Sequence, residues 1–315
     1  MARVLLTGGT GLIGKRLSQL LTGKGYEVVI LTRNARVAAK GRDTGIPGNG
    51  YAYWDIEKGE LAASVIREAD YIIHLAGAGV AEKRWSDKRK KEILESRTQS
   101  AKLLVTALSS MDNKVQAVIT ASAIGWYGPD TPQSILEGFR EDSPPAKDFL
   151  GTTCRLWEES IEGIAALGIR LVKLRTGIVL SKRGGALAAF LQPLKAGIAA
   201  ILGSGKQYIS WIHIDDLCRM YIQAMESGQF RGVYNAVAPV PVTNKELTLT
   251  LAQTKRGKYF IPVFIPAFLL RLILGEMSVE VLKSAKVSCE KVLETSFEFR
   301  FPTIKDALGE IFGNA

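Results

Sequence analysis

The chain has 315 residues, of which 47% are hydrophobic and 23% charged, and its formal net charge is +10 at pH 7. This composition is that of an ordinary globular protein, so a disordered or fibrous chain is excluded. The positive charge suits anionic ligands such as dinucleotides or nucleotide sugars. Nucleic acid is not an expected partner, because no basic segment interleaved with aromatic residues is present.

Cysteine and histidine are scarce in this chain. The three cysteines lie far apart and are odd in number, which argues against a disulfide framework and favours a reducing compartment. With two histidines and no cysteine cluster, no metal site is expected. The N-terminus lacks an apolar signal region that ends at a cleavage site, so we expect a cytoplasmic protein.

The first strand pattern runs directly into a glycine cluster and then into a helical pattern. Arg3–Leu6 predicts the strand and Leu12–Leu21 the helix. The spacing Gly9-x-Gly11-x-x-Gly14 between them lets a strand turn sharply and point a helix N-terminus at a pyrophosphate. It predicts a dinucleotide site; the alternative is an ordinary glycine-rich turn. The turn residues expected to bind are Gly8, Thr10, Gly11, Leu12, Ile13 and Gly14.

The ends of the next two strands bear on the choice of cofactor. Tyr26–Thr32 predicts a second strand, and Arg33 follows where an acidic residue would favour NAD(H). A guanidinium there suits a 2′-phosphate, so we predict NADP(H); the alternative is a solvated arginine. Asp55 follows the third strand, Tyr51–Trp54, and is placed to reach an adenine amino group.

Three more strand patterns follow, at Tyr71–Leu75, Val115–Thr120 and Ile169–Leu174, separated by helical patterns at Ser86–Leu108 and Phe149–Leu167. Residues 1–175 therefore predict an α/β fold with a Rossmann-type doubly wound parallel sheet. Residues 176–315 are broken by glycines and prolines into short elements, and we expect a smaller mixed C-terminal lobe there. The residues expected along the cofactor path beyond the fourth strand are Leu75, Ala76, Gly77 and Ala78.

An apolar run at Phe260–Leu274 needs weighing as a membrane segment. It contains Pro262, Pro266 and Arg271 and is shorter than the ~20 residues that span a bilayer. We expect a core-facing helix that starts near Pro266 and no membrane partner. The alternative is an anchor that lies in the bilayer interface.

The chain resembles the extended branch of the short-chain dehydrogenase/reductases, which includes nucleotide-sugar epimerases and dehydratases. More narrowly it resembles an atypical epimerase-like family of unsettled function, with a C-terminal domain of unknown function from about residue 262. The resemblance is carried by Thr7-Gly8-x-x-Gly11-x-x-Gly14, His74-Leu75-Ala76-Gly77, Arg84-Trp85, Ser96-Arg97, Ser122-Ala123-Ile124-Gly125-Trp126-Tyr127-Gly128, Trp157-Glu158, Trp211-Ile212-His213-Ile214-Asp215-Asp216 and Gly275-Glu276-Met277.

This resemblance implies roles for particular residues. The glycine turn would bind pyrophosphate, Arg33 the 2′-phosphate and Asp55 adenine, while the residues after the fourth strand would line the ribose and nicotinamide path. Ser122 matches the family's catalytic Ser/Thr position. Asp215 is expected to cap the helix that begins beside it.

One departure from the family pattern concerns proton transfer. The superfamily uses Tyr-x-x-x-Lys, in which the lysine lowers the tyrosine pKa from ~10. None of the nine tyrosines has a lysine four residues later, and the helix expected to carry the pair begins with Phe149 and Leu150. The standard acid/base pair is therefore absent.

Two functional hypotheses remain. The first is an NADP(H)-dependent oxidoreductase, or a sugar-nucleotide epimerase-like enzyme, that acts on an anionic or nucleotide-linked small molecule as a monomer or homodimer. Ser122 and Tyr127 are its candidate catalytic residues, and Trp126, Arg84 and Trp211 its candidate substrate contacts. The second is a non-catalytic NADP(H)-binding sensor or interaction module.

Overall fold

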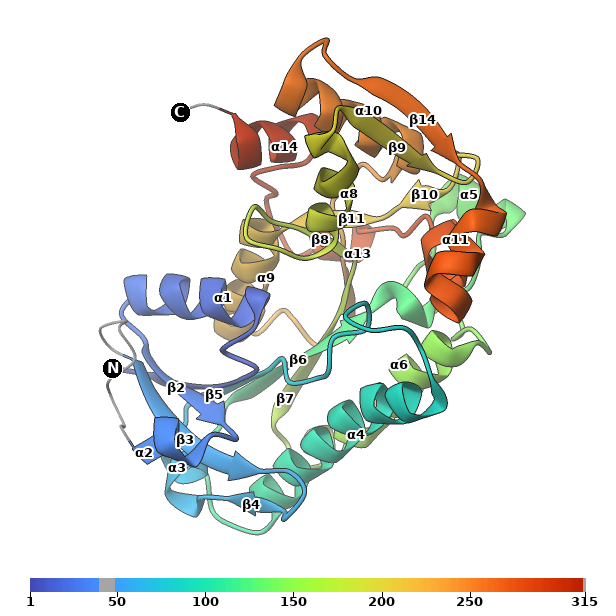
Figure 1. Ribbon diagram of the computed structural model, residues 1–315. Helices are drawn as coiled ribbons and strands as arrows, with labels where there is room; N and C mark the ends of the chain where they lie inside the picture. Colours follow the sequence, from blue (N-terminus) through green and yellow to red (C-terminus); the bar gives the residue numbers. More distant parts are fainter. Residues whose placement is uncertain (40–48, 314–315) are drawn as a thin grey trace.

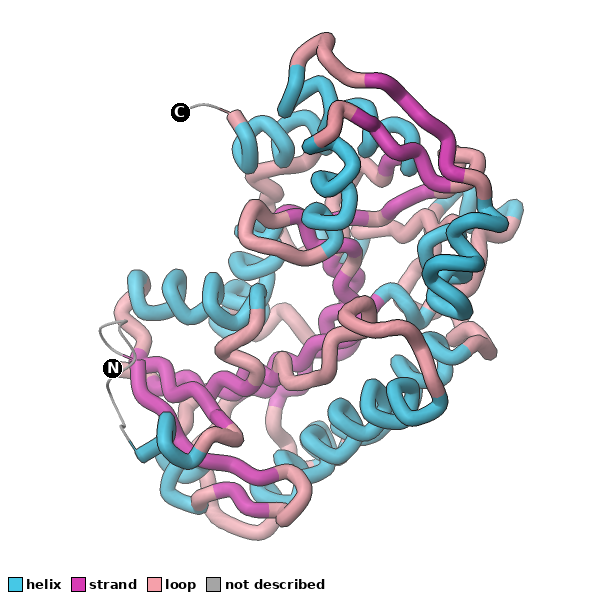
Figure 2. Tube along the Cα trace, viewed as in Figure 1, coloured by secondary structure: helices cyan, strands magenta, loops and turns pink. Residues whose placement is uncertain are grey.

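The structure, a computed structural model, describes residues 1–39 and 49–313. A parallel sheet with helices on both faces forms one part of the molecule, and smaller sheets and helices stand over its upper edge in Figures 1 and 2. The strands of the sheet are β1 (Arg3–Thr7), β2 (Glu27–Thr32), β3 (Asn49–Asp55), β4 (Glu60–Leu61), β5 (Tyr71–His74), β6 (Ala117–Ala123), β7 (Arg170–Thr176) and β12 (Gly232–Ala236).

The spatial order β12-β7-β6-β5-β1-β2-β3-β4 reverses direction at β1, as in doubly wound folds. All neighbours pair in parallel except β4, which pairs antiparallel with β3. The predicted α/β fold is confirmed. The helices that accompany this sheet are α1 (Leu12–Gly23), α2 (Ala35–Ala39), α3 (Ala63–Glu68), α4 (Asp87–Ser109), α6 (Phe149–Ile161), α7 (Gly163–Ala166) and α9 (Ile214–Glu226).

The sheet buries both of its faces, because successive side chains of each strand enter opposite cores. Val4 and Leu6 pack toward α1 and α9, whereas Leu5 between them packs toward α3 and α4. Helices α1 and α9 contact each other on the first face, and α4 contacts α6 on the second. The carboxyl ends of β1, β5, β6 and β7 therefore meet along one edge.

The smaller lobe has its own core around Trp211, Leu247 and Leu308. Its elements, with the short helices that join it to the sheet, are η1 (Ile124–Trp126), α5 (Pro132–Glu137), β8 (Ile178–Leu180), α8 (Ala186–Lys195), β9 (Ile198–Leu202), β10 (Tyr208–Ile209), β11 (Trp211–His213), β13 (Val242–Thr243), α10 (Asn244–Arg256), β14 (Ile261–Ile265), α11 (Ala267–Leu274), η2 (Gly275–Met277), α12 (Ser278–Leu282), α13 (Glu290–Leu293) and α14 (Ile304–Phe312). Between these elements the chain returns to the sheet as α9 and β12, so residues beyond 176 complete it.

The helix after β11 is capped differently from the sequence prediction. His213, not Asp215, is the N-cap, and its Nδ1 accepts a hydrogen bond from the Asp215 backbone N–H at 3.2 Å. The Asp215 carboxylate instead accepts two hydrogen bonds from Arg16 of α1, at 2.6 and 2.8 Å. The Arg16–Asp215 pair thus ties α1 to α9. His213 Nε2 lies 3.0 Å from Glu310 in α14, so this histidine has a structural role.

The prediction of a helix that starts near Pro266 is confirmed, but the prediction that this helix faces the core is wrong. Helix α11 does begin at Ala267, but Leu270 is the one described residue of this helix that is buried. Phe268 and Leu272 are 70% and 72% exposed. Within the described ranges, no helix combines the length and apolar character needed to cross a bilayer.

The glycine turn between β1 and α1 allows a sharp prediction about stability. A Cβ on Gly14 would lie 2.3 Å from the Gly8 carbonyl oxygen, whereas a Cβ on Gly11 would meet that oxygen at 3.2 Å. Gly14→Ala should therefore lower the free energy of unfolding by about 2–3 kcal/mol, since backbone atoms cannot move aside cheaply. Gly11→Ala, the matched control, should change it by less than about 1 kcal/mol. Urea titrations of both variants check this; equal stabilities would contradict the packing described.

Candidate functional site

A cradle for a phosphate lies where β1 turns into α1. Gly8 adopts φ +67°, and a Cβ on it would lie 2.8 Å from the Leu75 carbonyl carbon, so only glycine fits there. Helix α1 begins at Leu12 with Gly11 as N-cap, no side chain caps it, and its first turn holds no acidic residue. Its first N–H groups and positive dipole end are thus left for an anion. These residues fit a dinucleotide pyrophosphate.

A buried hydrogen-bond chain fixes the ends of β1 and β5 beside this turn. The Thr7 hydroxyl oxygen accepts from the backbone N–H groups of Leu75 and Ala76, each at 3.0 Å. Its own proton is then left to donate to His74 Nδ1 at 2.8 Å, so Nε2 carries the ring proton toward Ser100 at 3.3 Å. Burial lowers the pKa of His74 to about 3, which keeps it neutral and structural.

The two residues predicted to contact the adenosine half lie at adjacent strand ends. Arg33 follows β2, is exposed, and forms no ion pair with any described residue. Asp55 ends β3, and its carboxylate accepts from the backbone N–H groups of Lys58 and Glu57 at 3.1 and 3.0 Å and from the Tyr53 hydroxyl at 3.1 Å. These bonds, led by that from Lys58, lower the pKa of Asp55. A cation and an ionised acceptor therefore flank this end of the cradle.

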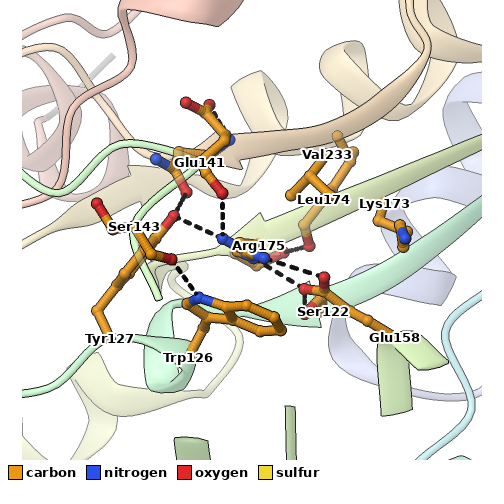
Figure 3. Close-up of polar contacts among 12 residues, drawn as sticks. Ser122, Trp126, Tyr127, Glu141, Ser143, Glu158, Lys173, Leu174, Arg175 and Val233 are labelled. Carbon is orange, nitrogen blue, oxygen red and sulfur yellow. Dashed lines mark hydrogen bonds and ion pairs between the residues drawn. The ribbon is translucent and has the colours of Figure 1, made fainter. Parts of the chain in front are cut away.

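The sheet register brings three polar side chains side by side at the ends of β6, β7 and β12. Ser122 lies opposite Arg175, and Arg175 lies opposite Asn235. Glu158 of α6 covers them: its carboxylate accepts from Ser122 Oγ at 2.6 Å and from Arg175 Nε and Nη2 at 2.8 and 3.0 Å (Figure 3). Ser122, Arg175 and Glu158 are all buried. The hydroxyl predicted to be catalytic is thus engaged with a carboxylate inside the protein.

Tyr127, the second predicted catalytic residue, belongs to the same cluster. Its hydroxyl accepts from Arg175 Nη1 at 3.0 Å and donates to Asn235 Oδ1 at 2.6 Å. The side chain has no exposed surface, and this burial raises the pKa of Tyr127 to about 12. Both hydrogen-bonding positions of the phenol are therefore taken, and proton exchange with a substrate is not supported by this geometry.

The structure separates the three predicted substrate contacts. Trp126 packs its ring on the Arg175 guanidinium, 3.6 Å from Cζ, and its indole N–H donates to Ser143 O at 2.8 Å (Figure 3). Trp211 has no exposed surface and belongs to the core of the smaller lobe, so its assignment to a substrate is corrected. Arg84 is exposed and lies beside Gly275, against the end of α11.

Arg97 in α4 is a residue that the sequence analysis assigned to no role. Its Nη1 donates to the carbonyl oxygens of Ala78 and Ile93, both at 2.9 Å, and a Cβ on Gly77 would lie 3.1 Å from its Cζ. No described carboxylate pairs with it, and burial lowers the pKa of Arg97. A guanidinium keeps its charge even so. An unpaired cation therefore lies beside the predicted nicotinamide path.

Trp157, which packs against Arg97, carries a further hydrogen-bond donor that no described residue engages. The Arg97 guanidinium stacks on the Trp157 ring of α6, 4.9 Å from the centroid. The indole Nε1 of Trp157 is buried and has no hydrogen-bond partner among the described residues. A buried N–H without a partner is costly unless a ligand or water meets it. The sequence analysis named Arg97 only within the Ser96-Arg97 motif of the resemblance, and it could not assign a role because α4 carries several other basic residues.

The fold and this edge of the sheet define a class of dinucleotide-binding protein, and sequence comparison gives the family. Residues 4–236 match the model of the NAD dependent epimerase/dehydratase family, and residues 265–311 match a domain of unknown function (DUF1731). The chain belongs to the NAD dependent epimerase/dehydratase family. The predicted resemblance to its epimerase-like members is confirmed.

Two relatives cover nearly the whole chain. The Epimerase family protein YfhF of Bacillus subtilis is 34% identical over 99% of this chain and 98% of its own. The Epimerase family protein SDR39U1 of Homo sapiens is 33% identical over 98% of this chain and 99% of its own. Neither name specifies a substrate.

Solved structures agree with the fold. The crystal structure of human SDR39U1 (isoform2) with NADPH matches with a TM-score of 0.84 and 31% identity, covering 99% of this chain and 100% of that one. A UDP-N-acetylglucosamine 4-epimerase from Methanobrevibacter ruminantium M1, in complex with UDP-N-acetylmuramic acid, has a TM-score of 0.78 at 17% identity over 99% of this chain and 97% of its own. The similarity to this epimerase, at 17% identity, shows only that the two proteins share a fold.

The buried ion pair can be tested by removing one charge. Glu158→Gln should lower the free energy of unfolding by about 3–5 kcal/mol, because the Arg175 guanidinium would stay buried without its counter-ion. Arg155→Met, which removes the exposed Arg155–Glu159 pair one turn away, should cost less than about 0.5 kcal/mol. Urea unfolding measures both variants. A Glu158→Gln protein as stable as the control would show that the pair does not organise this cluster.

Proposed function

We propose that this protein is an NADP(H)-dependent oxidoreductase that acts on a carbonyl or alcohol group of a small molecule. The observation that carries the proposal is the unpaired Arg97 guanidinium beside Gly77 and Ala78. A charge of this kind, partly withdrawn from water, can stabilise an oxygen that becomes negative during hydride transfer. In this proposal Arg97 takes over part of the task of the missing tyrosine and lysine.

The choice of NADP(H) is supported at both ends of the cradle. The uncapped start of α1 suits a pyrophosphate, and Arg33, which pairs with no described residue, offers a charge at the end of β2, where a 2′-phosphate would lie. The human relative SDR39U1, which covers 99% of this chain, was crystallised with NADPH. The net charge of +10 further favours an anionic or nucleotide-linked substrate.

The bound dinucleotide would supply or accept the hydride, and the chain's residues would manage the charge on the substrate oxygen. As a carbonyl carbon gains hydride, its oxygen gains negative charge, which Arg97 stabilises through hydrogen bonds. The guanidinium pKa is too high for Arg97 to give up a proton, so water protonates the oxygen. Since Ser122 and Tyr127 are engaged with Glu158 and Asn235, neither is assigned the proton.

The role of Arg97 can be separated from cofactor binding. Arg97→Met should lower kcat for NADPH-dependent carbonyl reduction by about 10²–10³-fold, as does loss of one donor to a developing oxyanion. Arg97→Lys, which keeps a charge with shorter reach, should lose less. NADPH affinity, measured by fluorescence titration, should change little in either variant. Unchanged kcat in Arg97→Met would contradict the proposal, and so would an equal loss of activity and NADPH affinity.

The selectivity for NADP(H) rests on Arg33. Arg33→Ala should weaken NADPH binding by about 30–100-fold, which corresponds to losing a charge-assisted contact of 2–3 kcal/mol. NADH affinity should stay the same, because NADH lacks the 2′-phosphate. Arg67→Ala, on the exposed face of α3, is the control. Isothermal titration calorimetry measures the affinity of each variant for both cofactors. An equal loss of affinity for NADPH and NADH in Arg33→Ala would mean that the 2′-phosphate binds elsewhere.

A second candidate function is a non-catalytic NADP(H)-binding sensor or interaction module. The observation in its favour is that the Ser122 and Tyr127 hydroxyls are buried and fully engaged. Incubating the purified protein with NADPH and a panel of aldehydes, ketones and nucleotide sugars separates the two functions. Tight NADPH binding with no oxidation across the panel would favour the sensor, whereas turnover would exclude it.

A further inference from the structure

Helix α11 has the composition of a buried helix but is mostly exposed. Seven of its eight residues are apolar, with Arg271 as the exception, yet Leu270 alone among them is buried. A helix that is apolar all round is normally enclosed by protein or by lipid. The described residues of this chain do not enclose it, so something else is expected to cover it.

The exposed apolar surface continues along the strand that leads into this helix. Strand β14 pairs with β9 on one side, and no described strand pairs with its other side. Figure 1 shows β14 and α11 following one another along the outer edge of the smaller lobe. The exposed large apolar and aromatic side chains of this β14–α11 face are Tyr259, Ile261, Val263, Phe264, Phe268, Leu272 and Ile273.

The exposed charged residues within this face, Lys258 and Arg271, are both basic. No acidic residue occurs between Glu246 and Glu276, whereas four basic residues do, among them the exposed Lys258 and Arg271. Glu276, at the border, is paired with Lys90 of α4 at 2.9 Å. No carboxylate among the described residues pairs with Lys258 or Arg271, so both cations on the apolar face are left without a counter-ion there.

We propose that the β14–α11 face binds the surface of an anionic lipid bilayer. Apolar side chains would enter the boundary between headgroups and acyl chains, Tyr259 would lie at headgroup depth, and Lys258 and Arg271 would contact anionic headgroups. With eight residues, α11 is about 12 Å long, so it would lie in the interface and not span it. The interfacial anchor considered for this segment is thus favoured over a core helix.

Charge decides between a bilayer and a second copy of the chain. In a two-fold symmetric dimer this face would meet itself, and Lys258 and Arg271 would approach cations of the partner. Like charges brought together in this way oppose association. Anionic headgroups complement the same charges, so the bilayer is the better partner for this surface.

The test uses the full-length protein and sedimentation with vesicles. One set of vesicles is phosphatidylcholine alone, and the other contains phosphatidylserine as well. The wild-type protein should sediment with the anionic vesicles, and less so as salt is raised. Phe268→Ser/Leu272→Ser should lower the partition coefficient at least tenfold with an unchanged circular dichroism spectrum. Leu293→Ser, which alters a 47% exposed leucine on α13, is the control and should bind like the wild type.

Three results would overturn the proposal. The first is no sedimentation of the wild-type protein with anionic vesicles. The second is equal binding by the wild type and a correctly folded Phe268→Ser/Leu272→Ser variant. The third is a wild-type dimer in analytical ultracentrifugation that the double variant disperses, without vesicle binding, which would assign the face to a second copy of the chain.

Discussion

The buried ion pair between Arg175 and Glu158 is the interaction on which the rest of this site depends. It joins β7 to α6 at the edge where an open α/β sheet binds its ligands. Burying two charges is costly unless every donor and acceptor is satisfied, and here Ser122, Tyr127 and the Glu141 carbonyl complete the set. The hydroxyls that a related enzyme would use for proton transfer are thereby committed to structure.

The proposed function therefore places the substrate oxygen near another part of the sheet edge, and the glycine turn at β1 is unaffected by the ion pair. The glycine turn and the Thr7–His74 chain lie at β1 and β5, on the far side of β6 from the ion pair. Arg97 approaches that same region from α4. In the proposed function, the protein thus combines a dinucleotide site with a cation in place of a proton donor, an arrangement that favours charge stabilisation over acid/base catalysis.

The features of the fold that could be predicted from the sequence are those that depend on a local pattern of residues. The glycine turn and six of the seven strands that lie between Arg3 and Thr176 were recognisable, because apolar runs and glycine spacing are local signals; the two-residue β4 was not predicted. The return of α9 and β12 to the sheet was missed, since periodicity does not say which sheet a strand joins. The role of Arg97 was missed because the absence of a carboxylate partner among the described residues is a property of the folded protein. The exposure of α11 was missed because apolar residues predict burial.

The most direct measurement of the central claim is a crystal structure of this protein with NADPH and an unreactive alcohol or carboxylate that occupies the substrate position. We expect the nicotinamide beside Gly77 and Ala78, with a ligand oxygen hydrogen-bonded to Arg97 and the adjoining carbon about 3–3.5 Å from nicotinamide C4. A ligand oxygen bound instead by Ser122 or Tyr127, with the Glu158 carboxylate turned away, would contradict the central claim.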